Sequence, residues 1–187
     1  MEGNNAELEE AAMVLVKEFI PDILVDLKFA KEDNFTGKVI YDFQDAYLRY
    51  GTVKKLKLAQ QMLRQQGTGL KIWDGYRPVF AQFRFWELCP DDTYVADPRK
   101  GYSNHSRGNA VDVTLVDAQG NELEMPTAFD DFEAIPNRDY SMRTETAARN
   151  ARLLEQTMER CGFLGYEGEW WHFSDSVRYP VEEHFVP

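Results

Sequence analysis

Two polar segments far apart in the 187-residue chain restrict its possible folds most strongly, because they carry two of its three histidines. The first segment, Tyr102–Val113, reads YSNHSRGNAVDV, and the second, Glu169–His172, reads EWWH. Each segment places a histidine near a carboxylate. A fold that brings the two segments together would create a metal site, so we look first for a fold of this kind.

The residues that form this predicted metal site are His105, Asp112 and His172. Imidazole nitrogens and a carboxylate suit zinc, and three protein ligands leave a fourth tetrahedral position open, which is typical of a catalytic site. We therefore predict one zinc ion per chain. Glu169, three residues before His172, is the candidate general base that takes a proton from water and passes it to the leaving amine.

The local patterns leave alternatives open. The spacing of His105 and Asp112 is loose, and carboxylates in strands can be exposed. The aromatic residues around His172 fit a sheet edge packed on a core, with Glu169 solvated. On an ideal strand, residues three apart point to opposite faces. Glu169 and His172 therefore reach one metal only if the strand bends near Gly168. Otherwise His172 binds the metal, and Glu169 contacts the ligands and not the ion.

Length and composition predict one globular domain over residues 1–187, with a loose acidic start over residues 1–10. Hydrophobic residues make up 43% of the chain and aromatic residues 13%, which is enough for a core. The net charge of −11 disfavours nucleic acid and acidic membrane surfaces as partners. The longest apolar run is far shorter than the roughly 20 residues that cross a bilayer.

The start of the chain also bears on its location. Glutamates precede the first apolar run, so the basic start of a signal peptide is missing. We predict a cytoplasmic location, or a periplasmic one if a leader has been removed. Nothing in the sequence indicates an oligomeric state.

Periodicity and turn residues predict an α+β fold with a mostly antiparallel central sheet flanked by helices. Residues 33–37 have the composition of a turn, and residues 126–141 form a long irregular loop. The alternation in residues 110–116 predicts a strand with one polar face. The helices are expected at 53–66, from Pro78 to about 89, and 144–160, and the strands at 14–16, 23–27, 70–74, 110–116, 163–166 and 170–174.

The remaining histidine and the two cysteines have simpler explanations. Cys89 and Cys161 form no Cys-x-x-Cys pair, so we predict free thiols, although a disulfide between them is possible. His184 lies beside two glutamates without a surrounding motif, so we interpret it as a surface residue.

Three motifs resemble one known family. They are Ser103-x-His105-Ser106-Arg107-Gly108-x-Ala110-x-Asp112, Glu169-Trp170-Trp171-His172 and Asp74-Gly75-Tyr76-Arg77-Pro78. Their order and content resemble the D-alanyl-D-alanine dipeptidases of the vancomycin-resistance type. These enzymes belong to a wider zinc peptidase group that includes D-Ala-D-Ala carboxypeptidases and hedgehog domains. The likeness extends from Asp33 to the last strands, and it implies the fold of that group.

The resemblance also implies residue roles. His105, Asp112 and His172 would hold the zinc, Glu169 would act as general base and acid, and Arg77 would stabilise the transition state. Local evidence alone offers a second role for Arg77, that of capping carbonyls at a turn.

The resemblance further implies that Ser103 lies near the substrate and that Phe129-Asp130 belongs to a loop over the substrate's amino end. One departure from the family is Phe29, which stands where its relatives have tyrosine. The missing hydroxyl removes a possible substrate hydrogen bond.

We therefore expect zinc-dependent hydrolysis of D-Ala-D-Ala, or of a related dipeptide that contains a D-amino acid, to free amino acids. Two alternatives remain: a D,D- or L,D-carboxypeptidase that trims longer peptidoglycan peptides, and a zinc-containing binding module without turnover. Glu169 and Arg77 argue against the binding module. Antibiotic resistance, wall recycling and nutrient salvage all use the same reaction, so the sequence does not separate these roles.

Overall fold

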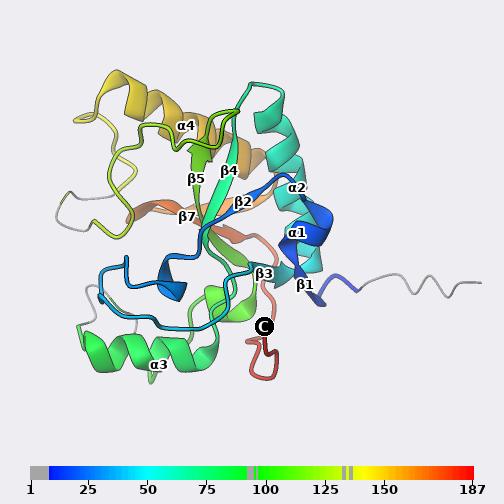
Figure 1. Cartoon of the computed structure of the whole chain (residues 1–187), viewed down its shortest axis with the longest axis vertical. Coiled ribbons are helices and arrows are strands. Elements are labelled where there is room, and N and C mark those ends of the chain that lie inside the picture. Colours follow the sequence, from blue (N-terminus) through cyan, green and yellow to red (C-terminus); the bar gives the residue numbers. More distant parts are fainter. Residues whose placement is uncertain (1–8, 92–94, 96, 132–133, 135–136) are drawn as a thin grey trace, which may run out of the picture.

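A five-stranded sheet with strand order β2-β4-β5-β7-β6 forms the centre of the computed structural model (Figure 1). Residues 9–91, 95, 97–131, 134 and 137–187 are described. Strand β2 runs parallel to β4, and the other neighbouring pairs are antiparallel. The predicted α+β fold with a mostly antiparallel sheet is confirmed.

The helices and strands have the following bounds. The central sheet contains β2 (Leu24–Val25), β4 (Gly69–Asp74), β5 (Ala110–Val116), β6 (Phe163–Tyr166) and β7 (Glu169–Asp175). A separate antiparallel pair joins β1 (Met13–Leu15) to β3 (Tyr47–Arg49). The α-helices are α1 (Val16–Phe19), α2 (Tyr50–Arg64), α3 (Val79–Leu88) and α4 (Glu145–Arg160), and two 3-10 helices, η1 (Lys28–Ala30) and η2 (His105–Arg107), complete the set.

The long predicted elements are present, with small shifts at their ends. Helix α2 begins three residues before the predicted start. We had predicted that Pro78 is the first residue of α3, but it precedes the helix as its N-cap. Helix α1 and strand β3 were not predicted, because a segment of three or four residues is too short to show a period. None of the helices in the described part of the chain is long and apolar enough to cross a membrane.

Helices α2 and α4 lie together over one face of the sheet (Figure 1). Asp175, at the end of β7, points to this face, because it accepts a hydrogen bond from Thr52 of α2 at 2.8 Å and pairs with Lys55. Side chains alternate along a strand, so His172 points to the opposite face. Asp112 lies directly across from His172 in the β5–β7 ladder. The site therefore occupies the sheet face that α2 and α4 leave uncovered.

Both faces of β5 are buried. Val111, Val113 and Leu115 have no exposed surface, and Asp112 and Thr114 on the other face are 3% and 1% exposed. The sequence predicted a polar face for this strand, and the structure shows that loops bury this face too. A buried aspartate needs a compensating partner, because an unpaired buried charge is costly.

Arg49 joins three segments that are distant in sequence. Its guanidinium donates hydrogen bonds to the carbonyl oxygens of Ala11 (2.6 Å), Arg107 (2.8 Å) and Pro180 (3.1 Å), and it pairs with Glu182 at 3.1 Å. The loop that carries His105 is thereby tied both to the start of the described chain and to its carboxyl-terminal tail.

The predicted loose start lies largely outside the described residues, which begin at Glu9. Glu10 is held in place, because its carbonyl accepts a hydrogen bond from the Gly51 N–H at 2.9 Å and its carboxylate pairs with Lys54. A side chain at Gly51 would meet the Glu10 carboxylate. The start of the described chain is therefore tied to the beginning of α2.

The simple interpretations of the cysteines and of His184 agree with the structure. Cys89 and Cys161 are free thiols, and the sulfur of Cys161 lies 3.7 Å from that of Met62. His184 is exposed in the carboxyl-terminal tail, where its N–H donates to Glu182.

Leu115 is a direct test of the core, because it is fully buried near the end of β5. The substitution Leu115→Ala should lower the free energy of unfolding by about 2–5 kcal/mol, since it removes buried methyl groups and leaves a cavity. Leu164→Ala, at a site that is 60% exposed, is the matched control and should change it by less than about 0.5 kcal/mol. Urea unfolding of both variants measures the difference, and equal effects would contradict the assigned core.

Candidate metal centre

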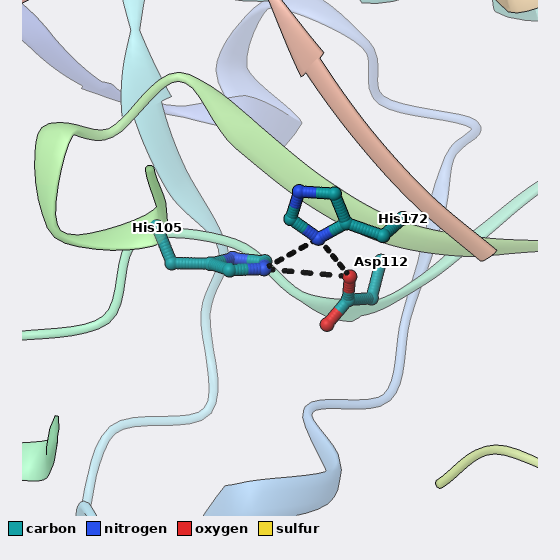
Figure 2. Close-up of side chains that lie close together, drawn as sticks. All are labelled: His105, Asp112 and His172. Atoms are coloured by element: carbon teal, nitrogen blue, oxygen red, sulfur yellow. Dashed lines mark hydrogen bonds and ion pairs between the residues drawn. The ribbon is translucent and has the colours of Figure 1, made fainter. Parts of the chain in front are cut away.

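Three elements bring the predicted ligands together (Figure 2). Asp112 in β5 and His172 in β7 are cross-strand partners. His105 lies in η2, just before β5. Gly108 ends η2 with φ of +72°, a left-handed conformation that glycine adopts without strain, and the chain can then turn directly into β5. The loop and the strand therefore place two ligands close together from nearby positions in sequence.

The potential ligand atoms of the three side chains lie at the spacing that a metal requires. His105 Nε2 is 3.2 Å from His172 Nδ1 and 3.4 Å from Asp112 Oδ1, and His172 Nδ1 is 3.0 Å from the same oxygen (Figure 2). Tetrahedral zinc with bonds of about 2.0–2.1 Å separates its ligands by about 3.3 Å. The side chains therefore fit the ion without rearrangement.

The outer nitrogens of both imidazoles are also satisfied. His105 Nδ1 donates to the Gly75 carbonyl at 2.8 Å, which leaves Nε2 with its lone pair facing inward. His172 Nε2 lies 3.1 Å from the Ser174 hydroxyl, which also accepts a hydrogen bond from the Asn104 amide at 3.1 Å. This arrangement suits a His172 Nε2–H donor, so its Nδ1 lone pair faces the same centre.

The charges at this centre favour a cation. Burial opposes ionisation of Asp112, yet His105 and His172 hold its pKa well below the usual range. Burial also lowers the pKa of His105, but the charge of Asp112 outweighs this effect and raises it overall. An ionised carboxylate and two inward lone pairs within 3.4 Å create a strongly negative centre.

Glu169 and His172 reach the same centre because β7 is irregular between them. In the β6–β7 ladder Gly165 pairs with Phe173, but the next residue of β6, Tyr166, pairs with Glu169, which lies four residues before Phe173 in β7. The Glu169 carboxylate consequently lies 3.9 Å from His172 Nδ1. Burial and the charge of Asp112 raise its pKa, although the neighbouring cationic groups oppose this shift. The bend that the sequence required near Gly168 thus lies within β7 itself.

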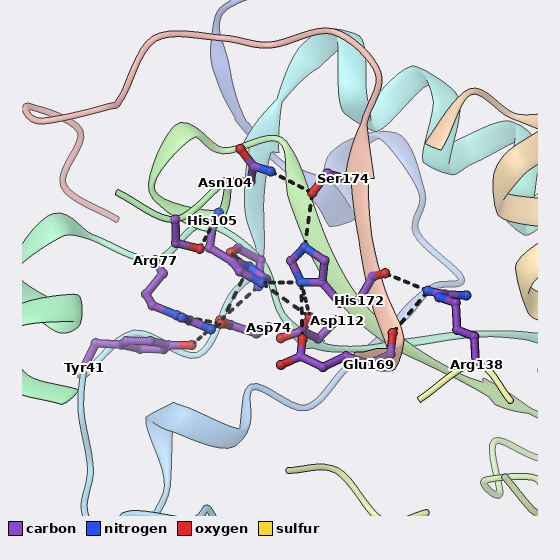
Figure 3. A network of polar contacts seen from close by, with 12 residues as sticks. Tyr41, Asp74, Arg77, Asn104, His105, Asp112, Arg138, Glu169, His172 and Ser174 are labelled. Carbon is purple, nitrogen blue, oxygen red and sulfur yellow. Dashed lines mark hydrogen bonds and ion pairs between the residues drawn. The ribbon is translucent and has the colours of Figure 1, made fainter. Parts of the chain in front are cut away.

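Arg138 holds the irregular part of β7 in place. Its guanidinium donates to the carbonyl oxygens of Glu169 (3.2 Å) and His172 (2.9 Å), as Figure 3 shows. It also donates to the carbonyl oxygen of Tyr166 (2.9 Å) and pairs with Glu155 of α4 at 3.2 Å. Sequence reasoning missed this residue, because it lies in the irregular loop before α4 and belongs to no motif.

Arg77 is fixed beside the metal centre by Asp74 (Figure 3). Its Nε and Nη2 donate to one oxygen of Asp74 at 2.9 and 2.6 Å, and the hydroxyl of Tyr41 donates to the other at 2.6 Å. The guanidinium lies 5.1 and 5.0 Å from the ring centres of Phe29 and Phe85. The Arg77 side chain therefore binds a carboxylate. In the alternative role that local evidence offered, it would have capped backbone carbonyls at a turn.

Ser103 and Asp130 lie at the edge of the centre. The Ser103 hydroxyl accepts a hydrogen bond from the His105 N–H at 3.2 Å and so supports η2. Asp130 has φ of +54°, an uncommon conformation for a residue other than glycine and one that often marks functional sites. Burial and the charges of Asp112 and Glu169 raise the pKa of Asp130 well above its usual range.

Comparison with known proteins identifies the family. A family model described as D-Ala-D-Ala dipeptidase matches residues 9–186, nearly the whole chain. The chain belongs to this family. The resemblance inferred from the three motifs is confirmed, and the protein is a zinc metallopeptidase with a centre whose residues fit the ion.

Two relatives have similar lengths. The chain is 37% identical over 181 residues to the D-alanyl-D-alanine dipeptidase of Escherichia coli K12, with 96% of this chain and 91% of the relative covered. It is 32% identical over 184 residues to that of Enterococcus faecium, with 88% and 91% covered. Among solved structures, the LdcB LD-carboxypeptidase has a TM-score of 0.51 at 19% identity, with 94% of this chain and 71% of that one covered. This likeness shows the shared fold.

Zinc binding tests the centre directly. After a chelator has removed any bound metal, we expect the protein to take up one zinc ion per chain. Zinc at about 100 times its Kd should stabilise the fold by roughly 2.7 kcal/mol. His172→Ala should lose this stabilisation, whereas His184→Ala should keep it because that residue lies exposed in the tail. Metal analysis and thermal unfolding with and without zinc measure both effects. Equal zinc binding by the two variants would contradict the ligand assignment.

Arg138→Ala should weaken zinc binding although it replaces none of the three proposed ligands. Its loss leaves three carbonyls without their donor, and an unsatisfied buried group costs about 1–3 kcal/mol. Support of this kind is typically worth about 10- to 100-fold in metal affinity, so we expect a loss of that size in chelator competition. Arg149→Ala removes the same charge from an exposed position on α4 and is the control. Unchanged zinc affinity in Arg138→Ala would show that β7 keeps its shape alone.

Proposed function

We propose that this protein hydrolyses D-Ala-D-Ala to two molecules of D-alanine. The observation that carries the proposal is the cluster of His105, Asp112 and His172, whose ligand atoms lie within 3.4 Å of one another beside Glu169. Membership of the dipeptidase family, with relatives of nearly the same length, supports the substrate. When bound at this cluster, zinc polarises the scissile carbonyl and activates water at neutral pH.

Glu169 is proposed as the general base and acid. A base must lie within hydrogen-bond reach of the proton that it removes, and the Glu169 carboxylate is 3.9 Å from His172 Nδ1, one of the proposed ligand atoms. Burial and Asp112 raise its pKa, so a proton taken from water is held more firmly. Glu169 can then pass this proton to the leaving amine, which completes hydrolysis of the peptide bond.

Arg77 is proposed to stabilise the negative charge that develops on the carbonyl oxygen. A guanidinium carries five N–H donors, and the bonds of Nε and Nη2 to Asp74 fix its orientation before substrate binds. Burial opposes the charge on Arg77, but Asp74 raises its pKa and keeps it cationic. The two flanking aromatic rings further limit its movement.

The two ends of a dipeptide need separate partners, since it is a zwitterion. We propose that Asp130 binds the ammonium group, because its buried Oδ2 has no hydrogen-bond partner among the described residues. Ser103 is proposed to lie near the substrate as well, since its hydroxyl hydrogen remains available after the oxygen accepts from His105. Phe29 supplies no hydroxyl, and the Tyr41 hydroxyl close to it is bound to Asp74. Substrate recognition therefore differs at this position from relatives that have tyrosine.

The cytoplasmic location stays a prediction, with the periplasm as its alternative, and cell fractionation with an antibody to the protein tests it. The net charge of −11 argues against nucleic acid and anionic membranes as partners, because like charges repel.

Glu169→Gln should abolish hydrolysis of D-Ala-D-Ala and leave zinc bound. Amide for carboxylate keeps the shape of the side chain and removes its ability to accept a proton, and general acid–base catalysis is worth about 10²–10⁴ in rate. Release of D-alanine and the zinc content are measured on the same samples. Glu167→Gln, in the neighbouring turn, is the control and should keep full activity. A Glu169→Gln variant with wild-type turnover would remove Glu169 from the mechanism.

The choice of substrate is tested by comparing free D-Ala-D-Ala with a pentapeptide that ends in D-Ala-D-Ala. We expect a higher kcat/KM for the dipeptide, because Asp130 would form an ion pair with an ammonium that the longer peptide lacks at this position. Preference for the pentapeptide would favour a carboxypeptidase. If zinc-loaded protein hydrolyses neither peptide, the binding module is the better interpretation.

A further inference from the structure

A cavity of about 510 Å³ lies beyond Asp130, between the loop that follows η1 and the segment that leads to Asp130. Its wall includes Phe35, Trp73, Thr114 and Phe129. This volume falls within the range of about 300–1,000 Å³ found for ligand pockets. A methyl group, the side chain of alanine, would leave most of it empty.

The cavity continues the sheet face on which the metal cluster lies. Thr114, in its wall, is two residues beyond Asp112 on β5, and residues two apart on a strand share a face. Asp130 also lines the cavity, and its pKa responds to the charges of Asp112 and Glu169, which indicates that it lies close to the cluster. A substrate whose ammonium binds Asp130 would therefore have its first side chain close to the residues that line the cavity.

Two buried polar atoms in this wall lack a partner among the described residues. They are Oδ2 of Asp130 and Oγ1 of Thr114, and Thr114 is only 1% exposed. Unpaired buried polar atoms are uncommon in folded proteins and suggest a missing ligand or water. The Asp130 oxygen is assigned above to the substrate's ammonium, so the Thr114 hydroxyl is left for a second polar group.

The charge of the wall indicates a cation. Four carboxyl groups line the cavity, those of Asp33, Glu122, Asp130 and Asp131, against one cation in the described lining, Lys28, although burial raises the pKa of Asp130 and so reduces its share of the negative charge. Lys28 is already paired with Asp33 at 3.4 Å and with Asp26 at 3.5 Å.

Glu122 is similarly occupied, because it accepts hydrogen bonds from Lys71 and from the Trp73 indole. Asp131 differs, since within the described part of the chain its side chain accepts one hydrogen bond, at 3.2 Å, from the Ala134 N–H to Oδ1. Once the substrate's ammonium neutralises Asp130, Asp131 remains as the negative charge available to a second cation.

We propose that this cavity is a binding pocket for a basic side chain on the amino-terminal residue of the dipeptide, with Thr114 and Asp131 as its polar contacts. The proposal rests on the dipeptidase function proposed above and adds a substrate class to it: D-lysyl-D-alanine and similar dipeptides, besides D-Ala-D-Ala.

Four dipeptides that differ only in the first residue test the pocket. They are D-Ala-D-Ala, D-Lys-D-Ala, D-norleucyl-D-Ala, which has the same carbon chain without the ammonium, and D-Glu-D-Ala, which has the opposite charge. We expect kcat/KM for D-Lys-D-Ala to exceed that for the norleucine peptide by about tenfold or more, since a charge-assisted hydrogen bond is roughly twice as strong as a neutral one. The glutamate peptide should be the poorest substrate.

Variants of the wall test the assigned contacts. Asp131→Asn and Thr114→Val keep side-chain size and should each lower the ratio of kcat/KM between the lysine and norleucine peptides by about fivefold or more. Lys17→Gln, which changes a charge on the distant helix α1, should leave this ratio unchanged. Unfolding curves confirm that each variant is folded.

The possible outcomes separate the pocket from the function. Turnover of D-Ala-D-Ala with equal rates for the lysine and norleucine peptides, or with exclusion of both, overturns the pocket and leaves the dipeptidase function intact. A lysine preference that neither Asp131→Asn nor Thr114→Val reduces overturns the pocket too. If the zinc-loaded protein hydrolyses none of the four, the proposed function fails and the pocket with it.

Discussion

The mutual repulsion of the atoms at the metal cluster is the constraint on which the site depends. Two imidazole lone pairs and an ionised carboxylate oxygen lie 3.0–3.4 Å from one another in a buried place, where water screens charge poorly. With both imidazoles neutral, such an arrangement is unfavourable unless a metal cation occupies its centre or the surrounding structure prevents the side chains from separating. The charge of Asp112, which raises the pKa of His105, favours a proton there when no metal is bound. Here the surroundings act on every member: Gly75 and Ser174 bind the imidazoles from behind, and the β5–β7 ladder fixes Asp112 opposite His172.

The contacts of Asp74 and Arg138 give similar rigidity to the side chains proposed to take part in catalysis. Asp74 accepts hydrogen bonds from Tyr41, from the Gly75 N–H and from Arg77, so one buried carboxylate orients an arginine and the turn behind His105. Arg138 performs the corresponding task for β7. The groups expected to react are thus positioned by side chains that need not touch the substrate, and this preorganisation lowers the reorganisation required during the reaction.

The sequence predicted the parts of this arrangement that depend on local pattern. The alternation of residues 110–116 and the helical period of residues 144–160 correspond closely to β5 and α4. The histidines and Asp112 could be selected because their residue types are rare or chemically distinctive, and family motifs then supplied their roles.

Arg138 could not be found in this way, because its contacts with backbone carbonyls are long-range and leave no periodic signal. Ser174 lies only two residues from His172, but no motif marks its hydroxyl as a partner of that imidazole. The irregularity in β7 was recognised only as a geometric requirement, since a bulge depends on the pairing of two strands and not on one of them. The burial of Asp112 and Thr114 likewise depends on loops that the strand's own pattern does not contain.

The contacts of Arg49 have a consequence for local opening of the structure. Its buried guanidinium bonds the carbonyls of Arg107 and Pro180 and pairs with Glu182. If the segment of Pro180 and Glu182 detaches, the guanidinium loses two of its partners, and an unpaired buried charge is costly. Detachment of this segment and loosening of the loop that carries His105 should therefore be cooperative.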